Sequence, residues 1–274
     1  MATIVERIPL KERRPDVLSG TPRAHSIDRW IFVITAAWFI LIVLTGFIPD
    51  SVMKVGMVKA GVRPPFPPAL HVHAALMGTF LLLLLAQTWL MATGRKAMHM
   101  QFGIAGVAVA AALVLAGAVL APTMYYETWD ALQTAPAAAR GQLQQLLSIK
   151  ENILLLQMRI GVLFPLFLAI GIAARGSDPG LHKRMVILAT AVPIEAAIAR
   201  MDWLPTTMPG SPASMELFGV LIIAPMFVWD VIRNRSVHRA YWWWLSIYVA
   251  TAVVVELLWD KPAWHAMAKA IMRV

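Results

Sequence analysis

The sequence has no cysteine and comparatively few charged residues. Without thiols, disulfide bonds, thiolate metal sites and cysteine nucleophiles are all excluded. Charged residues make up only 14% of the chain and hydrophobic residues 59%, and the apolar residues come in long blocks, as a bilayer requires. This composition indicates an integral membrane protein.

Several motifs of known chemistry are also absent. There is no glycine-rich phosphate loop, no His-Glu-x-x-His zinc helix and no Gly-x-Ser-x-Gly elbow. A retinal Schiff base needs a lysine deep in the last apolar run, whereas Lys261 lies beyond its end. Residues 1–29 contain acidic residues and no apolar core, so they do not form a cleaved signal peptide and the first apolar run must direct membrane insertion.

What the sequence does contain is a series of long apolar runs. Most of them are close to the roughly 20 residues that a transmembrane helix needs, and the run at 217–231 is the shortest. We therefore predict an all-α fold, a polytopic transmembrane bundle of seven helices within residues 30–260. The predicted spans are 30–48, 70–91, 102–120, 153–174, 185–203, 217–231 and 242–259.

Basic residues are distributed unequally between the two sides of this bundle. One side holds 14 of the 24 Lys and Arg residues and the other eight. The richer side holds Arg7, Lys11, Arg13, Arg14, Arg23, Arg29, Arg95, Lys96, Arg175, Lys183, Arg184, Arg233, Arg235 and Arg239. The positive-inside rule then predicts a cytoplasmic tail at 1–29 and an external tail at 261–274. Because the basic residues lie singly or in pairs at span ends, no nucleic-acid partner is expected despite the net charge of +9.

Two predicted external loops are long, at 49–69 and 121–152. The first ends in four prolines that cannot sustain a helix, Pro64, Pro65, Pro67 and Pro68. The second contains Leu143, Leu146 and Leu147 at helical spacing, which predicts a helix lying on the outer surface.

His71 and His73 open the second span. Positions i and i+2 of a helix are about 200° apart, so the two imidazoles should face different directions and should not chelate one ion together. One interpretation is a pair of interfacial histidines. The other is a cofactor-binding role, with one ligand for a metal or haem and one partner that carries protons.

Glu195 and Arg159 reach similar depths in the fifth and fourth spans. Ionisable groups in a membrane usually pair, so one interpretation is a structural ion pair that locks two helices. The other is a catalytic pair in an outer-leaflet cavity, with His73 and Glu195 as metal ligands and Gln157 and Arg200 in the lining. Such a cavity would hold a metal, a quinone or a lipid head group. Asp202, Glu216 and Glu256 lie near the same level.

His99 and His182 begin the third and fifth spans at the basic side. Their neighbours are cationic, which favours contact with anionic lipid head groups. The alternative is a bis-histidine haem between the two spans, with Lys183, Arg184 or Arg95 near the propionates.

These histidines lie in strings that resemble a known group. The strings are Pro-x-x-x-His-Val-His at the start of the second span, His99 to Gly103, and His182-Lys183-Arg184-Met185. Over roughly residues 65–200 they resemble an uncharacterised family of bacterial multi-span membrane proteins. The chain departs from its typical forms at Ala74, Met100 and Gln101. The resemblance implies that the histidines form a pattern, and it supplies no reaction. A looser similarity to b-type membrane cytochromes rests on histidines at both ends of a bundle.

Together these patterns predict a protein of the bacterial inner membrane with a polar site in the outer leaflet. The expected role is redox-linked, with haem b or a transition metal as cofactor. Two alternatives stay open: an accessory or assembly subunit of a larger membrane complex, and a carrier for lipids or small molecules. The sequence does not predict a substrate or an oligomeric state.

Overall fold

The computed structural model describes residues 16–274, and the regular structure of that part of the chain is entirely helical. The helices are α1 (Ser26–Lys59), α2 (Pro68–Ala92), α3 (Lys96–Thr134), α4 (Ala137–Ala174), α5 (Pro179–Ile198), α6 (Ala213–Leu221), α7 (Ala224–Asn234), α8 (Arg239–Leu258) and α9 (Pro262–Met272). The predicted all-α class is confirmed. Four of the basic residues that predict the orientation, Arg7, Lys11, Arg13 and Arg14, lie outside the described residues.

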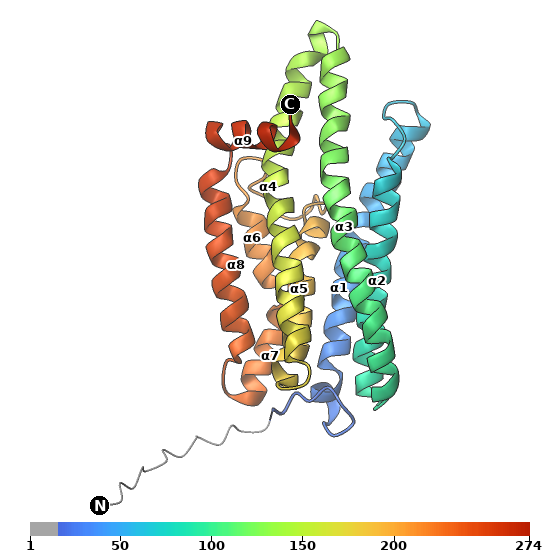
Figure 1. The fold of residues 1–274 in the computed structure, drawn as a ribbon, viewed down its shortest axis with the longest axis vertical. Helices are drawn as coiled ribbons and strands as arrows, with labels where there is room; N and C mark the ends of the chain where they lie inside the picture. The colour runs from blue at the N-terminus through green and yellow to red at the C-terminus, as the bar shows by residue number, and fades with distance from the viewer. Residues whose placement is uncertain (1–15) are drawn as a thin grey trace, which may run out of the picture.

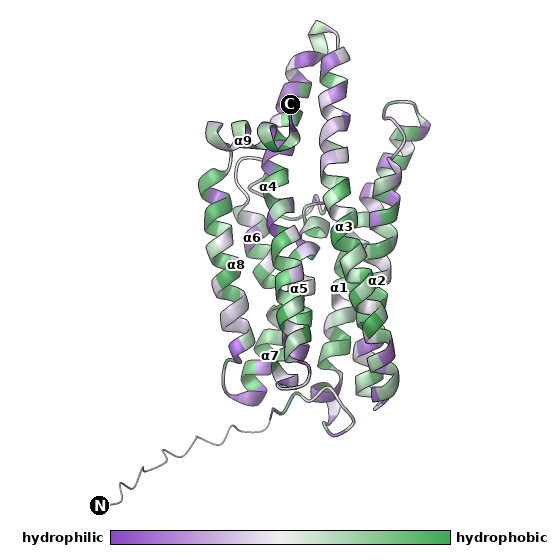
Figure 2. Ribbon diagram, viewed as in Figure 1, coloured by the Kyte–Doolittle hydropathy of each residue, from purple (hydrophilic) through white to green (hydrophobic). Residues whose placement is uncertain are grey.

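Five helices are long and apolar enough to cross a membrane, namely α1, α2, α3, α4 and α8. The short helices α6 and α7 form a sixth candidate as a pair that is bent by 44° at a break. Apolar residues run along these helices, and polar residues gather toward their ends (Figure 2). The protein is therefore an all-helical membrane protein with five to six candidate spans.

Helix α5 lies inside the bundle and packs against α1, α4, α6 and α8 (Figure 1). Most of its residues are buried, but Lys183, Arg184 and Glu195 interrupt its apolar sequence, so charge rather than length separates it from the five candidate spans. Gly46 lets α1 approach it closely, because a Cβ atom there would lie 2.1 Å from the carbonyl oxygen of Ala197. The charged residues of α5 are thus shielded by the helices that surround it.

The segment predicted as one span at 217–231 is broken into α6 and α7. Pro225 follows the break and has no N–H to continue the helical hydrogen bonds. The indole Nε1 of Trp38 on α1 donates to the carbonyl oxygen of Ile222 at 3.2 Å. This bond satisfies a backbone acceptor that the membrane interior would otherwise leave unpaired.

The predicted external loops are largely helical instead. Helix α1 continues to Lys59, and α3 and α4 are separated only by Ala135 and Pro136. The leucines expected on a separate surface helix at 143–147 belong to α4. Polar residues end an apolar run without ending a helix. The spans predicted from hydropathy therefore stop before the helices do. The joined ends of α3 and α4 project beyond the bundle, and α9 lies across the same end (Figure 1).

Candidate functional site

The predicted ion pair between Arg159 and Glu195 is present. Nη2 of Arg159, on α4, donates to Oε1 and Oε2 of Glu195, on α5, at 3.0 and 2.9 Å. The two side chains are only 3% and 4% exposed. The prediction that these residues meet across adjacent helices is therefore confirmed.

Arg159 has a second acidic partner that the sequence pattern did not assign to it. Its Nη1 donates to Oε1 of Glu216, in the first turn of α6. Tyr248 of α8 places its ring 4.8 Å from the guanidinium carbon, and its hydroxyl donates to Oε2 of Glu195 at 3.4 Å. We call Arg159, Glu195, Glu216 and Tyr248 the Arg159 cluster. It joins α4, α5, α6 and α8.

The Arg159 cluster is incomplete in two ways. One guanidinium faces two carboxylates, and Nε of Arg159 and Oε2 of Glu216 are buried without a hydrogen-bond partner. Space around Tyr248 is tight, because a Cβ atom at Gly219 would lie 2.1 Å from the tyrosine hydroxyl. Buried polar atoms are rarely left unpaired, so these two atoms distinguish the Arg159 cluster from a fully bonded ion-pair network.

The other predicted residues of the outer site lie elsewhere. His73 is on α2 beside Gly117 of α3, and its buried Nδ1 has no hydrogen-bond partner. His71 is exposed and meets the ring of Phe66 edge-on at 6.2 Å, so the two imidazoles do have different surroundings. Arg200 pairs with Asp50 of α1 at 3.4 Å.

The structure does not pair His73 with Glu195. The hydrogen-bond partners of Glu195 are Arg159 and Tyr248, and α2 packs against α1 and α3. Among residues 16–274, no group of three or more His, Asp or Glu side chains has an arrangement that would hold a metal ion. The metal site predicted at His73 and Glu195 thus gains no support.

At the opposite end of the bundle, His99 and His182 come together. Their ring centroids are 6.4 Å apart with planes at 81°. Nδ1 of His182 lies 2.8 Å from the carbonyl oxygen of Gly171 on α4, and Nδ1 of His99 lies 3.3 Å from that of Gln87 on α2. A carbonyl accepts only N–H, so both neutral rings carry their proton on Nδ1 and leave the Nε2 lone pair free.

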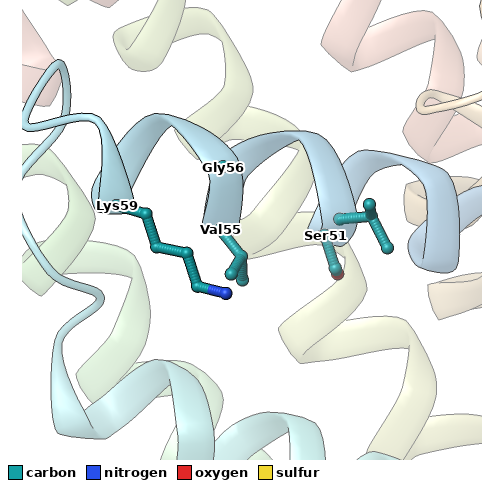
Figure 3. Close-up of a pocket in the computed structure, with 5 residues that line it drawn as sticks. Ser51, Val55, Gly56 and Lys59 are labelled. Atoms are coloured by element: carbon teal, nitrogen blue, oxygen red, sulfur yellow. The ribbon is translucent and has the colours of Figure 1, made fainter.

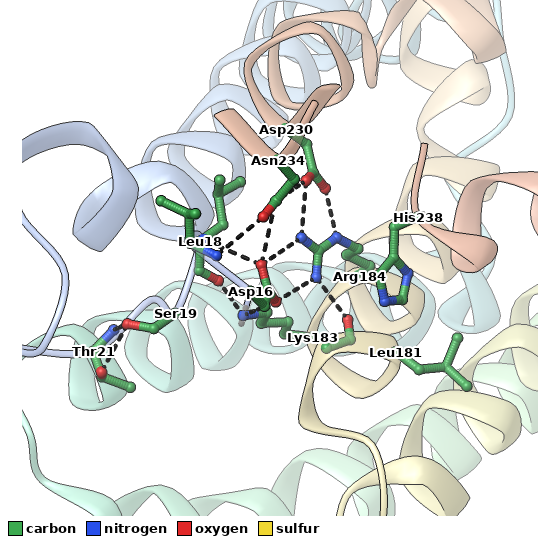
Figure 4. Close-up of polar contacts among 12 residues, drawn as sticks. Asp16, Leu18, Ser19, Thr21, Leu181, Lys183, Arg184, Asp230, Asn234 and His238 are labelled. Carbon is green, nitrogen blue, oxygen red and sulfur yellow. Dashed lines mark hydrogen bonds and ion pairs between the residues drawn. The ribbon is translucent and has the colours of Figure 1, made fainter. Parts of the chain in front are cut away.

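Near this pair lies a second buried network, centred on Arg184 of α5 (Figure 4). Arg184 is fully buried and donates to both carboxylate oxygens of Asp16 at 2.8 and 3.0 Å. It donates to both oxygens of Asp230, on α7, at 2.5 and 2.9 Å and to the carbonyl of Gly180 at 3.1 Å. All five N–H groups of a guanidinium are therefore used.

Further partners complete this Arg184 cluster, which we define as Arg184, Asp16, Asp230, Lys183, Asn234 and Tyr241. Asp230 accepts from Asn234 at 2.7 Å and from the Tyr241 hydroxyl at 2.8 Å. Lys183 pairs with Asp16 at 2.7 Å. Two cationic residues thus face two carboxylates, and the segment preceding α1 is fastened to α5 and α7.

The pKa shifts at the end of the bundle that holds the Arg184 cluster agree with its ion pairs. Burial raises the pKa of the Asp16 carboxyl, but hydrogen bonds and charge from Arg184 and Lys183 outweigh it and hold this pKa well below its usual range. Burial and the charge of Arg184 lower the pKa of His238 to about 4. Neutral His238 accepts the N–H of Ala240 at Nδ1, 3.2 Å away, and caps α8.

Sequence reasoning treated Arg184 only as an orientation signal or a propionate neighbour and did not consider Asp16 or Asp230. A usable signal was Asp230 itself, a carboxylate at the end of an apolar run that needs a cationic partner.

Two hollows on the surface are lined by residues outside both clusters. One is lined by Ser51, Val52, Val55, Gly56 and Lys59 along the last turns of α1 (Figure 3). Another lies between α1 and the α6–α7 break and is mostly apolar. Neither contains a predicted site residue.

Comparison with known proteins adds no relative: no protein-family model, curated protein or solved structure matches this chain.

Proposed function

We propose that this chain is a seven-span protein of the bacterial inner membrane with its amino terminus in the cytoplasm. Helix α5 and the bent α6–α7 pair join the five long apolar helices to make seven crossings. An odd number of crossings is supported by the start of α1 and by α9, which lie at opposite ends of the bundle (Figure 1). A reporter active only outside the cytoplasm, fused after Val274, should be active; activity only at an amino-terminal fusion would contradict this orientation.

The proposed activity is one-electron redox chemistry at a haem b held by His99 and His182. The observation that carries it is the orientation of the two imidazoles, each fixed by a backbone carbonyl at Nδ1 so that Nε2 is free to ligate. Hydrogen bonds of this kind set the tautomer and direction of metal-ligating histidines. Their rings come from α3 and α5, so a shared ligand would bridge two helices.

The donor set fits haem better than a bare metal ion. Haem supplies its own ring of nitrogen ligands to iron, so two imidazoles are sufficient protein ligands. A bare ion needs more protein ligands, and residues 16–274 provide no group of three. Arg175 is exposed and its charge acts on His182, so it is a cation of the kind that pairs with a propionate. When bound, the haem would supply reversible one-electron transfer, and the chain would supply the imidazoles of His99 and His182 as ligands.

The test is haem binding by the full chain in detergent. The purified protein, supplied with haemin, should show a Soret band and about one haem per chain by the pyridine haemochrome assay. His99→Ala and His182→Ala should each abolish this band or convert it to a weak five-coordinate form.

His71→Ala is the matched control, because His71 is exposed and lies on a different helix from the pair. It should leave the band unchanged. Failure to bind haemin, or a band insensitive to both variants, would contradict the haem proposal, and stoichiometric metal without a Soret band would replace haem by a bare ion.

A second candidate function is that of an accessory subunit of a larger membrane complex. It is favoured by α2 and α3, whose most apolar stretches are only 17% and 11% buried and so leave a broad face open to lipid or protein. If a partner covers this face, the protein extracted in mild detergent should have the mass of a complex that contains it. A single chain under those conditions would contradict this candidate.

A further inference from the structure

The Arg159 cluster carries an inference that is independent of haem binding. Its ionisable groups are unequal in number, because Arg159 bears one positive charge while Glu195 and Glu216 can bear two negative charges. Burying an uncompensated charge is costly, and two carboxyl groups that share one site avoid this cost when one of them is protonated. The cluster therefore needs one more positive charge than its side chains provide.

Within residues 16–274, Arg159 is the one cationic side chain that pairs with Glu195 or Glu216. The helices packed against α5 are α1, α4, α6 and α8. Arg200, just beyond α5, is paired with Asp50 of α1 and lies 4.3 Å from the ring of Phe47. Tyr248 of α8 adds only a hydroxyl donor. On α4, Glu151 pairs with His265 of α9 at 2.5 Å. The excess negative charge thus remains within the Arg159 cluster.

The unpaired atoms show where the missing charge would be held. Oε2 of Glu216 is buried without a partner, although Oε1 of the same carboxyl accepts from Arg159. Nε of Arg159 is also unpaired, in a side chain that is 3% exposed. Both oxygens of Glu195, in contrast, accept from Nη2 of Arg159. Glu216 is thus the carboxyl with a free oxygen.

Exposure distinguishes the same two carboxyl groups. The side chain of Glu216 is 15% exposed, whereas that of Glu195 is 4% exposed. Glu216 lies in the first turn of α6, directly after the segment that connects α5 to α6. Exchange with water is therefore easiest through Glu216.

We propose that the Arg159 cluster is a binding site for one exchangeable proton, which enters and leaves through Glu216 and is shared with Glu195. Arg159 positions both carboxyl groups, and Tyr248 donates a hydrogen bond to whichever form of Glu195 is present. The protein thereby takes up and releases a proton at the end of the bundle opposite His99 and His182.

Infrared spectroscopy of the full chain in detergent tests this proposal, because a protonated carboxyl absorbs apart from a carboxylate. At neutral pH the wild-type protein should show one protonated carboxyl that shifts in D2O and disappears as pH is raised. Glu216→Gln and Glu195→Gln should each abolish this signal, since either leaves one carboxylate for one guanidinium.

Glu256→Gln is the matched control, because Glu256 is exposed on α8 and accepts from Ser211 at 3.1 Å outside the cluster. It should leave the signal unchanged. Absence of a protonated carboxyl in the wild-type protein at neutral pH, or its persistence in both cluster variants, would overturn the proposal, and the wild-type measurement decides even if a variant does not fold. Stabilisation by Na⁺ that needs Glu216, without a protonated carboxyl, would overturn it in favour of a cation site.

Discussion

Arg184 uses every N–H group it has, whereas Arg159 leaves its Nε without a partner. Both arginines are buried between helices and each bridges two carboxylates. Around Arg184 the charges balance, because Lys183 adds a second cation, but around Arg159 they do not. A balanced, fully bonded network fastens helices together, whereas an unbalanced network can still bind a proton. The Arg184 cluster is thus a structural fastening and the Arg159 cluster a candidate site, although both contain the same kinds of residue.

The largest effect should come from removing the arginines. Arg184→Met leaves Asp16 and Asp230 without their main cation, and we expect a loss of about 3–5 kcal/mol in the free energy of unfolding at neutral pH. Arg159→Met should cost less and should cost less still at acidic pH, because a buried carboxylate left without its cation can be neutralised by a proton. Chemical unfolding in detergent at several pH values measures the loss in each variant. Equal losses with equal pH dependence would contradict the proposed difference between the two clusters.

Glu195→Gln sharpens the same comparison. A single ion pair would be broken by this change, but the structure adds Glu216, which still balances Arg159. We therefore expect a loss below about 1 kcal/mol, against about 3–5 kcal/mol for Asp230→Asn, whose carboxylate is bonded to Arg184 through both oxygens. Unfolding of the two variants under identical conditions measures this contrast, and a loss at Glu195 as large as that at Asp230 would contradict it.

The two tyrosines form a matched pair. Tyr241 donates to Asp230 at 2.8 Å, whereas Tyr248 donates to Glu195 at the longer distance of 3.4 Å. Tyr241→Phe should cost about 1.5–3 kcal/mol, as for a hydrogen bond to a charged group, and Tyr248→Phe about 0.5–1.5 kcal/mol. Thermal unfolding of both variants ranks them, and the reverse order would show that the Arg159 cluster is the tighter of the two.

Gly219→Ala tests how closely the Arg159 cluster is packed. The added Cβ would displace the Tyr248 hydroxyl, and overpacking of this kind costs about 1–3 kcal/mol. Gly161→Ala is the control, because it lies within α4 and a Cβ there meets nothing within 4 Å. The control should be neutral or stabilising, so equal losses in both variants would mean that the loss at Gly219 does not come from its contact with Tyr248.

The smallest effect concerns pH at the Arg184 end. The pKa of His238 is about 4 in the folded protein, below the value of about 6.5 for an unfolded chain, so the unfolded state binds more protons between these values. Wild-type stability should therefore fall as the pH drops from about 6.5 to 4. His238→Asn keeps a helix-capping side chain and removes the titration, so its decline should be shallower; identical slopes would contradict the assignment.

The apolar runs sufficed to predict helices and most span positions, because the bilayer imposes a length and a composition that a sequence displays directly. Depth along a helix also follows from residue count, which is how Arg159 and Glu195 were matched. The direction of a side chain around the helix axis does not follow from residue count. The sequence therefore predicts Glu216 at the level of Arg159 and Glu195, but not as a partner of Arg159. Asp16 lies 168 residues from Arg184, and no local pattern connects them.

The ends of α3 and α4 were mispredicted for a different reason. Hydropathy marks where a helix leaves the lipid, but the helix itself continues as long as its backbone bonds and side-chain contacts permit. Tyr125 of α3 donates to Glu151 of α4 at 3.2 Å in this extension, and such a pair is invisible to a span prediction. Glu151, paired further with His265, holds α9 against the same two helices.

The α3–α4 hairpin is longer than the hydrocarbon layer of a membrane is thick. With 39 and 38 residues, the two helices are each nearly 60 Å long at about 1.5 Å per residue, against a hydrocarbon slab of about 30 Å. Roughly half of each helix thus extends beyond the slab as a stiff arm that ends at Ala135 and Pro136. A tilt of the hairpin by a few degrees would therefore displace this tip by a distance that grows with the length of the arm.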